Sequence, residues 1–75
     1  MITHAEVISV VAEALGVDVV TLHEDSKIGD IEKWDSLGHL KILMTIAERY
    51  SIEIGLDEME HLSSIEKITE RLGRQ

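Results

Sequence analysis

The stretch that decides the fold lies between Ile31 and Tyr50 and reads IEKWDSLGHLKILMTIAERY. From Leu37 onward, apolar residues recur at the spacing of an amphipathic helix, and polar residues fall mostly on its other side. The apolar stripe comprises Leu37, Leu40, Leu43, Met44, Ile46, Ala47 and Tyr50. We therefore expect a helix that begins around Asp35–Leu37 and carries His39 on its solvent-facing or partner-facing side.

Capping signatures predict one helix before this stretch and one after it. The segment Thr3-His4-Ala5-Glu6 has the form of a capping box, and Gly16 suits the position just past a helix end. The segment Ser63-Ser64-Ile65-Glu66 repeats the signature before a last helix that ends at Gly73. Residues 56–61 have room for only one or two turns. The expected fold class is all-α: a small four-helix bundle of three longer helices and one short helix, in a single domain over residues 1–75.

The two segments that connect these helices lack a helical period. Residues 17–35 are expected to form a long loop whose apolar residues attach it to the core, with a short helical turn near Val19. We expect Trp34 to be a half-buried anchor that fixes this loop against the bundle. Residues 51–55 alternate like a strand, but a lone strand has nothing to pair with. An extended connector is expected there, with Ile52 and Ile54 inserted into the core.

The composition excludes several classes of protein. A formal net charge of -8 argues against nucleic-acid binding, and the lack of cysteine excludes disulfides and thiolate metal sites. The four histidines show no metal-binding spacing, so we expect no metal site. No signal peptide is apparent and no apolar run approaches the roughly 20 residues of a membrane span, so we expect a monomeric cytoplasmic protein. The acidity either attracts a basic partner or only keeps a small protein soluble.

Ser36 is the residue on which the functional interpretation depends. A serine at a helix start commonly caps it, but Asp35 could cap this helix equally well, which would leave one of the two side chains without a structural task. His39 follows at a distance of one turn, so a Ser–His nucleophile has to be considered. No G-x-S-x-G elbow surrounds the serine, and a small bundle offers little room for a substrate pocket. We therefore expect no catalysis by this chain itself.

Asp35-Ser36-Leu37 at the start of an amphipathic helix resembles the attachment motif of acyl carrier proteins. The resemblance covers almost the whole chain: it includes the first helix and the long loop, Met44, Glu48, Tyr50, the Ile52–Ile54 connector, the acidic pair Asp57-Glu58 and the polar pair Ser63-Ser64. It implies a carrier protein, not an enzyme, in which Ser36 carries 4'-phosphopantetheine. A phosphopantetheinyl transferase would attach this group from coenzyme A.

The resemblance also implies partners and leaves alternatives open. The partners would be acyl- or aminoacyl-loading ligases, synthases or transferases of fatty-acid-like, polyketide or other specialised biosynthesis. Their recognition is expected to involve Asp35, Leu37, Gly38, Lys41 and Met44. One alternative is an aminoacyl or peptidyl carrier of a nonribosomal-type pathway. Another is an unmodified acidic interaction module, in which Ser36 is only a cap.

The chain departs from carriers of fatty-acid synthesis in where its charges lie. Those carriers usually have acidic residues at the positions that Gly38 and Lys41 occupy here. Residues 36–50 sum to a formal charge of +1, whereas residues 17–35 and residues 51–62 each sum to -4. The sequence Trp-Asp-Ser-Leu resembles discrete carriers of secondary-metabolite or surface-polysaccharide assembly. We therefore expect a specialised, freestanding carrier.

Overall fold

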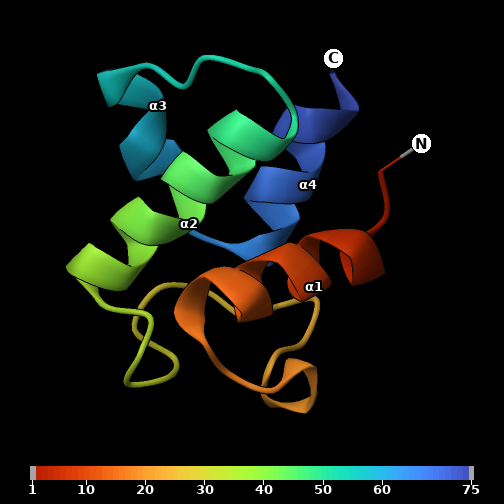
Figure 1. Ribbon diagram of the computed structural model, residues 1–75, viewed down its shortest axis with the longest axis vertical. Helices are drawn as coiled ribbons and strands as arrows, with labels where there is room; N and C mark the ends of the chain where they lie inside the picture. The colour runs from red at the N-terminus through yellow and green to blue at the C-terminus, as the bar shows by residue number, and fades with distance from the viewer. Residues whose placement is uncertain (1, 75) are drawn as a thin grey trace.

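The computed structural model describes residues 2–74 and contains four α-helices in that range. They are α1 (His4–Leu15), α2 (Ser36–Arg49), α3 (Leu56–His61) and α4 (Ile65–Gly73), and a 3-10 turn, η1 (Val19–Thr21), follows α1 (Figure 1). No strand forms within residues 2–74. The prediction of an all-α bundle with three longer helices and one short helix is confirmed.

The helices start and stop where their capping residues predict. Thr3 Oγ1 accepts a hydrogen bond from the backbone N–H of Glu6 at 3.1 Å, and Ser64 Oγ accepts one from Lys67 N–H at the same distance. Gly16 ends α1 in the left-handed conformation, with φ of 71°, which costs glycine little. Local side-chain chemistry therefore fixes the ends of α1 and the start of α4.

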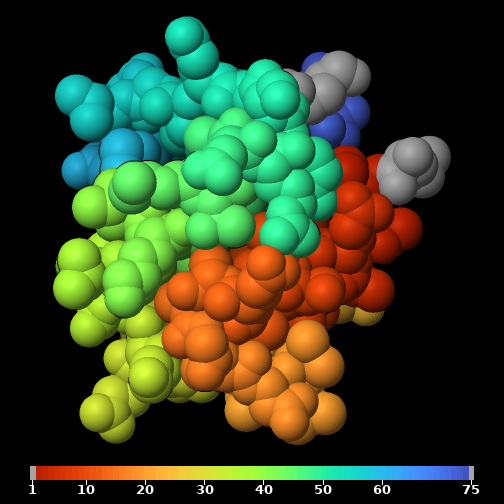
Figure 2. Space-filling view, in the orientation of Figure 1, coloured from red at the N-terminus to blue at the C-terminus, as the bar shows by residue number. Residues whose placement is uncertain are grey.

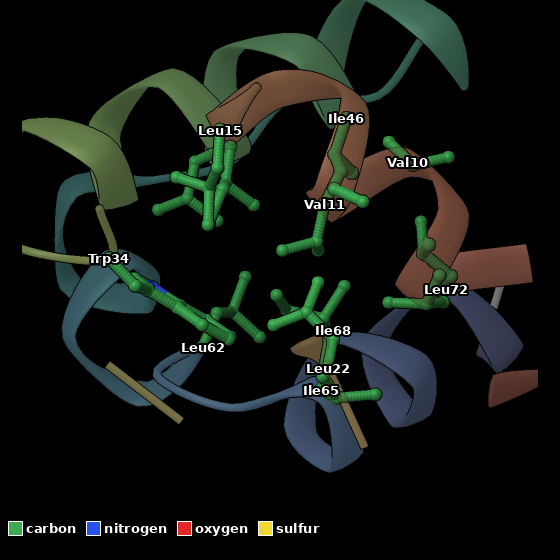
Figure 3. Packing of buried hydrophobic residues seen from close by; sticks show 14 residues of the cluster. Val10, Val11, Leu15, Leu22, Trp34, Ile46, Leu62, Ile65, Ile68 and Leu72 are labelled. Atoms are coloured by element: carbon green, nitrogen blue, oxygen red, sulfur yellow. The ribbon is translucent and has the colours of Figure 1, made fainter. Parts of the chain in front are cut away.

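The core consists of aliphatic side chains from α1, α2 and α4, together with Leu22 and Trp34 from the long loop and Leu62 from the segment before α4. Figure 3 shows the labelled aliphatic side chains directed into one shared interior, with Trp34 at one end of it. The fourteen buried hydrophobic residues are Val7, Val10, Val11, Ala12, Leu15, Leu22, Trp34, Ile42, Leu43, Ile46, Leu62, Ile65, Ile68 and Leu72. Trp34 is 0% exposed. The expectation of a half-buried anchor was wrong in degree, because the whole indole ring is enclosed.

The long loop between α1 and α2 is tied to the start of α4. Ile28 N–H donates to the carbonyl oxygen of Ser63 at 2.8 Å, and Ile65 N–H donates to the carbonyl oxygen of Ser26 at 3.0 Å. Leu22, next to η1, is buried in the core. The loop passes below α1 in Figure 1 before it rises to the first turn of α2. The predicted attachment to the core and the helical turn near Val19 are both confirmed.

Polar side chains at the surface join α1 to the end of α2. The guanidinium of Arg49 donates to both carboxylate oxygens of Glu13, at 2.8 and 3.0 Å. Tyr50 O–H donates to Glu6 Oε2 at 2.9 Å. Burial raises the pKa of the Tyr50 hydroxyl above its usual value, and the hydrogen bond to Glu6 and its negative charge raise it further, against the opposing charge of Arg49.

The connector from α2 to α3 is irregular, as expected, but its isoleucines lie at the edge of the core. Ile52 and Ile54 are half-buried and pack against the core from outside. The expectation that they would be inserted into the core was therefore wrong. They form one wall of a surface groove described below.

Candidate functional site

Asp35, and not Ser36, caps the first turn of α2. Asp35 Oδ1 accepts a hydrogen bond from the backbone N–H of Gly38 at 2.8 Å. The side chain of Ser36 is exposed, and its hydroxyl makes no hydrogen bond with any residue between 2 and 74. The structure thus decides between the two roles open to this Asp-Ser pair: the carboxylate caps the helix, and the hydroxyl has no structural task.

Ser36 also occupies a position that favours negative charge. It is the first residue of a 14-residue helix whose first turn contains no acidic residue. The leading N–H groups of a helix have no partners within it, and its dipole attracts anions at this end. A phosphate ester at such a position is favoured by about 0.3–1 kcal/mol when it is exposed to solvent.

Gly38 lets the long loop lie directly against the start of α2. It is buried, and a β-carbon built on it would collide with the backbone carbonyl oxygen of Lys33. The same β-carbon would lie 3.0 Å from the side chain of Leu15. The sequence assigns Gly38 to partner recognition, whereas the structure places it beneath the surface. There it sets the path of the loop that leads to Ser36.

His39 is buried, so the expectation of a solvent-facing or partner-facing side chain was wrong. Its exposed fraction is 8%, because it packs against Trp34, with the two rings stacked at a centroid distance of 6.2 Å. The indole Nε1–H of Trp34 donates to His39 Nδ1 at 3.0 Å, and His39 Nε2 lies 3.2 Å from the carbonyl oxygen of Met59. These partners assign the neutral imidazole with its proton on Nε2.

The sequence contains one signal that could have predicted the burial of His39, and this signal is Trp34. A buried indole N–H needs an acceptor, and His39 lies one turn inside the helix that follows it. Both ring nitrogens of His39 are engaged, so neither is available to take a proton from Ser36. The Ser–His pair considered from the sequence is therefore not formed.

The outer face of α2 exposes apolar side chains around a lysine. Leu37 and Met44 are each 63% exposed, and Leu40 is 41% exposed. Lys41 lies among them at helical spacing and forms no ion pair within the described part of the chain. Figure 2 shows α2, in green, along the front surface of the molecule. Asp35 and Ser36 precede this face directly.

Two of the grooves that adjoin α2 share one residue, Met59. The larger has a volume of about 600 Å³ and separates α2 from the connector and α3. It is lined by Leu40, Leu43, Met44, Ala47, Ile52, Glu53, Ile54, Gly55 and Met59. The smaller has a volume of about 270 Å³ and adjoins the candidate serine. It is lined by Ile28, Ser36, His39, Met59, Glu60 and Ser63.

No group of three or more histidine, aspartate or glutamate side chains among residues 2–74 is arranged to hold a metal ion. None of the helices in the described range has the length and hydropathy that crossing a membrane requires.

A small helical bundle with an exposed hydroxyl at a helix start, and no base organised to activate it, has the form of a carrier domain. A family model described as a phosphopantetheine attachment site matches residues 5–72. The chain is 34% identical over 68 residues to an acyl carrier protein of Campylobacter jejuni subsp. doylei, which covers 91% of this chain and 88% of that relative. It is 32% identical over 60 residues to an acyl carrier protein of Chlamydia caviae, which covers 80% of this chain and 78% of that relative.

The chain therefore belongs to the phosphopantetheine attachment family and is a carrier domain of the acyl carrier protein type. Its cofactor is covalently attached 4'-phosphopantetheine, and the chain has no catalytic activity of its own. The resemblance seen in the sequence is confirmed at the level of family, cofactor and type of function.

Proposed function

We propose that Ser36 Oγ is the point of phosphopantetheine attachment and that the chain carries acyl groups for a specialised biosynthetic pathway of the cytoplasm. The observation that carries this proposal is the division of roles between two neighbours. Asp35 caps α2, which leaves the Ser36 hydroxyl exposed and without a hydrogen bond inside residues 2–74. When bound, the cofactor supplies a terminal thiol that holds acyl groups as thioesters.

The residues around Ser36 fit an attached phosphodiester. The helix start favours its charge, and the exposure of Ser36 leaves room for a chain that extends into solvent. Because both ring nitrogens of His39 are engaged with Trp34 and Met59, His39 does not supply the base that takes the hydroxyl proton. Asp35 contributes by holding the first turn in place.

Partner enzymes are proposed to dock along the α2 face that Leu37, Lys41 and Met44 define, beside Asp35. Exposed apolar groups close to an attachment point gain stabilisation when a partner covers them. Lys41 adds a positive charge without an ion pair in the described range, whereas the rest of the chain is acidic. This distribution supports partners other than those of housekeeping fatty-acid synthesis. Full replacement of a fatty-acid carrier in a reconstituted synthase would contradict this specialisation.

Intact mass after coexpression with a broad-specificity phosphopantetheinyl transferase tests the attachment site. We expect the mass of one phosphopantetheine to be added, and we expect Ser36→Ala to abolish the addition. Ser9→Ala is the matched control, because Ser9 is also an exposed helical serine. Modification of Ser36→Ala, or a bare wild-type protein, would contradict the proposal, and the second result would favour an unmodified interaction module.

The identity of the cargo is tested by a second mass measurement. The modified protein is incubated with loading enzymes and either fatty acyl, polyketide or amino-acid substrates. We expect a thioester with an acyl group. A thioester with an amino acid would instead assign the chain to aminoacyl carriage in a nonribosomal-type pathway.

A further inference from the structure

The buried imidazole of His39 joins three segments of the chain at one point. Trp34 belongs to the long loop, His39 lies in the first turn of α2, and the carbonyl oxygen of Met59 lies in α3. The two contacts that join them measure 3.0 and 3.2 Å. Ser36 lies three residues before His39, in the same turn. The three segments therefore meet directly beneath the candidate attachment site.

The α3 helix is held by a small number of contacts, which include Met59 against the core and the buried Leu62 directly after its last residue. It has six residues, none of them buried, and its N-cap Gly55 offers no side-chain hydrogen bond. An isolated helix of this length is unstable in water, so its contacts with the rest of the chain have to hold it. Glu58 provides one such contact through its ion pair with Arg71, at 3.2 Å. The contact from His39 to Met59 is a polar side-chain link between α2 and α3.

The position of Met59 has a consequence for Ser36. Met59 and Glu60 of α3 form part of the wall of the small groove that also includes Ser36. An enzyme that reaches the Ser36 hydroxyl has to cover this groove, so it meets α3 as well as α2. A displaced α3 would present a different surface at the place where the transferase binds.

From these contacts we infer that His39 is a positioning residue for the attachment site. It holds α3 and the Trp34 end of the loop against the first turn of α2, and it touches neither the hydroxyl nor the cofactor. The assignment rests on the proposed role of Ser36. When the competent arrangement is populated only part of the time, the apparent affinity of a partner falls in proportion. Loss of the link should therefore raise the KM of the transferase for this protein and leave kcat unchanged.

The test compares His39→Leu, which removes both polar contacts, with His39→Gln, whose amide offers one acceptor and one donor. Amide hydrogen exchange is measured for each helix, and phosphopantetheinyl transfer is followed by intact mass. In His39→Leu we expect faster exchange confined to α3 and the loop near Trp34, and a KM raised about fivefold with kcat unchanged. His39→Gln should restore most of both properties. Ser9→Ala, on the exposed side of α1, is the control and should change neither.

In the wild-type protein, nitrogen NMR should show His39 as the neutral imidazole with its proton on Nε2. Unchanged α3 exchange and an unchanged KM in His39→Leu would overturn the inference. Faster exchange in all four helices of that variant, without rescue by His39→Gln, would also overturn it, because His39 would then support the core as a whole. If the wild-type protein is never modified, the proposed role of Ser36 fails, whereas hydrogen exchange still decides whether His39 holds α3.

Discussion

The two ends of α2 are stabilised by different kinds of contact. Towards its C-terminus, α2 packs on α1, and its buried aliphatic side chains belong to the core that α1 and α4 also form. Its polar ties to α1 lie at the surface. At its N-terminus, the contacts are directional and depend on single atoms: the cap from Asp35, the close approach at Gly38 and the hydrogen bonds of His39. Aliphatic packing tolerates exchanges between apolar side chains of similar volume, whereas a hydrogen bond does not tolerate the loss of its partner.

The stability of the fold and the presentation of the attachment site are therefore largely separate properties of this molecule. Changes in the aliphatic body should lower the free energy of unfolding without altering how Ser36 is presented. Changes at the start of α2 should alter modification even where they cost less stability. Substitutions in the aliphatic core and at the start of α2 test whether the free energy of unfolding and the rate of modification change independently.

Ile68→Ala should have the largest effect on stability. Ile68 is 1% exposed, and truncation of a buried isoleucine removes packing and leaves a cavity. We expect the free energy of unfolding to fall by about 2–5 kcal/mol, as measured by urea denaturation. At temperatures where the variant remains folded, its transferase kcat/KM should equal that of the wild type. A lower kcat/KM under those conditions would break the separation.

Gly38→Ala should cost less stability but should impair modification. The new β-carbon displaces the Lys33 carbonyl and with it the end of the loop, at a cost of about 1–3 kcal/mol in the free energy of unfolding. Gly73→Ala is the matched control, because its β-carbon would meet no atom within 4 Å. We expect slower phosphopantetheinyl transfer only for Gly38→Ala. Equal rates in both variants would show that the path of the loop does not matter to the transferase.

Asp35→Ala should destabilise the first turn of α2. Loss of the hydrogen bond to Gly38 N–H is expected to lower the free energy of unfolding by about 0.5–2 kcal/mol. Asp35→Asn keeps a side-chain oxygen that can cap, so it should retain most of the stability while it removes the charge. The rates of phosphopantetheinyl transfer to the two variants then show whether the transferase depends on the capping hydrogen bond or on the carboxylate charge of Asp35. If both variants lose the same stability, capping is not the role of Asp35.

Tyr50 should give the smallest effect, and it lies at the other end of α2. Because its pKa is raised in the folded state, the native protein retains the hydroxyl proton at pH values where the unfolded chain has lost it. The contribution of Tyr50 to stability is therefore full below its ordinary pKa of about 10 and decreases as the pH rises towards the folded value.

Absorbance of the tyrosinate measures this difference directly, because Tyr50 is the only tyrosine in the sequence. The titration should occur at higher pH in the native protein than in urea. Glu6→Gln should move it part of the way back, since burial, the larger cause, remains. An unchanged titration in Glu6→Gln would mean that the negative charge of Glu6 does not raise the pKa of Tyr50.

Much of the fold follows from local signals in the sequence. Capping residues such as Thr3 and Ser64 act within one turn, and the aliphatic stripes of the helices repeat at a fixed spacing. These signals correctly predicted the four helices and the long loop. The family and the cofactor were implied by the resemblance of almost the whole chain to acyl carrier proteins, of which the motif around Ser36 is one part.

The sequence was less informative where contacts depend on residues far apart or on single atoms. Ile52 and Ile54 are apolar, but their distance from the core follows from the path of the connector. His39 is polar, so its place in the helical pattern predicted exposure. Its burial follows from the indole N–H of Trp34 and the carbonyl of Met59, which lies 20 residues away.

Residues that are neighbours along the chain were sufficient to predict the helices, their ends and the candidate serine, and the resemblance of almost the whole chain to acyl carrier proteins implied the family. Only the tertiary structure decided that Asp35 caps the helix while Ser36 is free, that Gly38 admits the loop, and that His39 is enclosed. Hydrogen-bond partners and steric contacts are properties of positions in space, and hydrophobic periodicity carries no information about them.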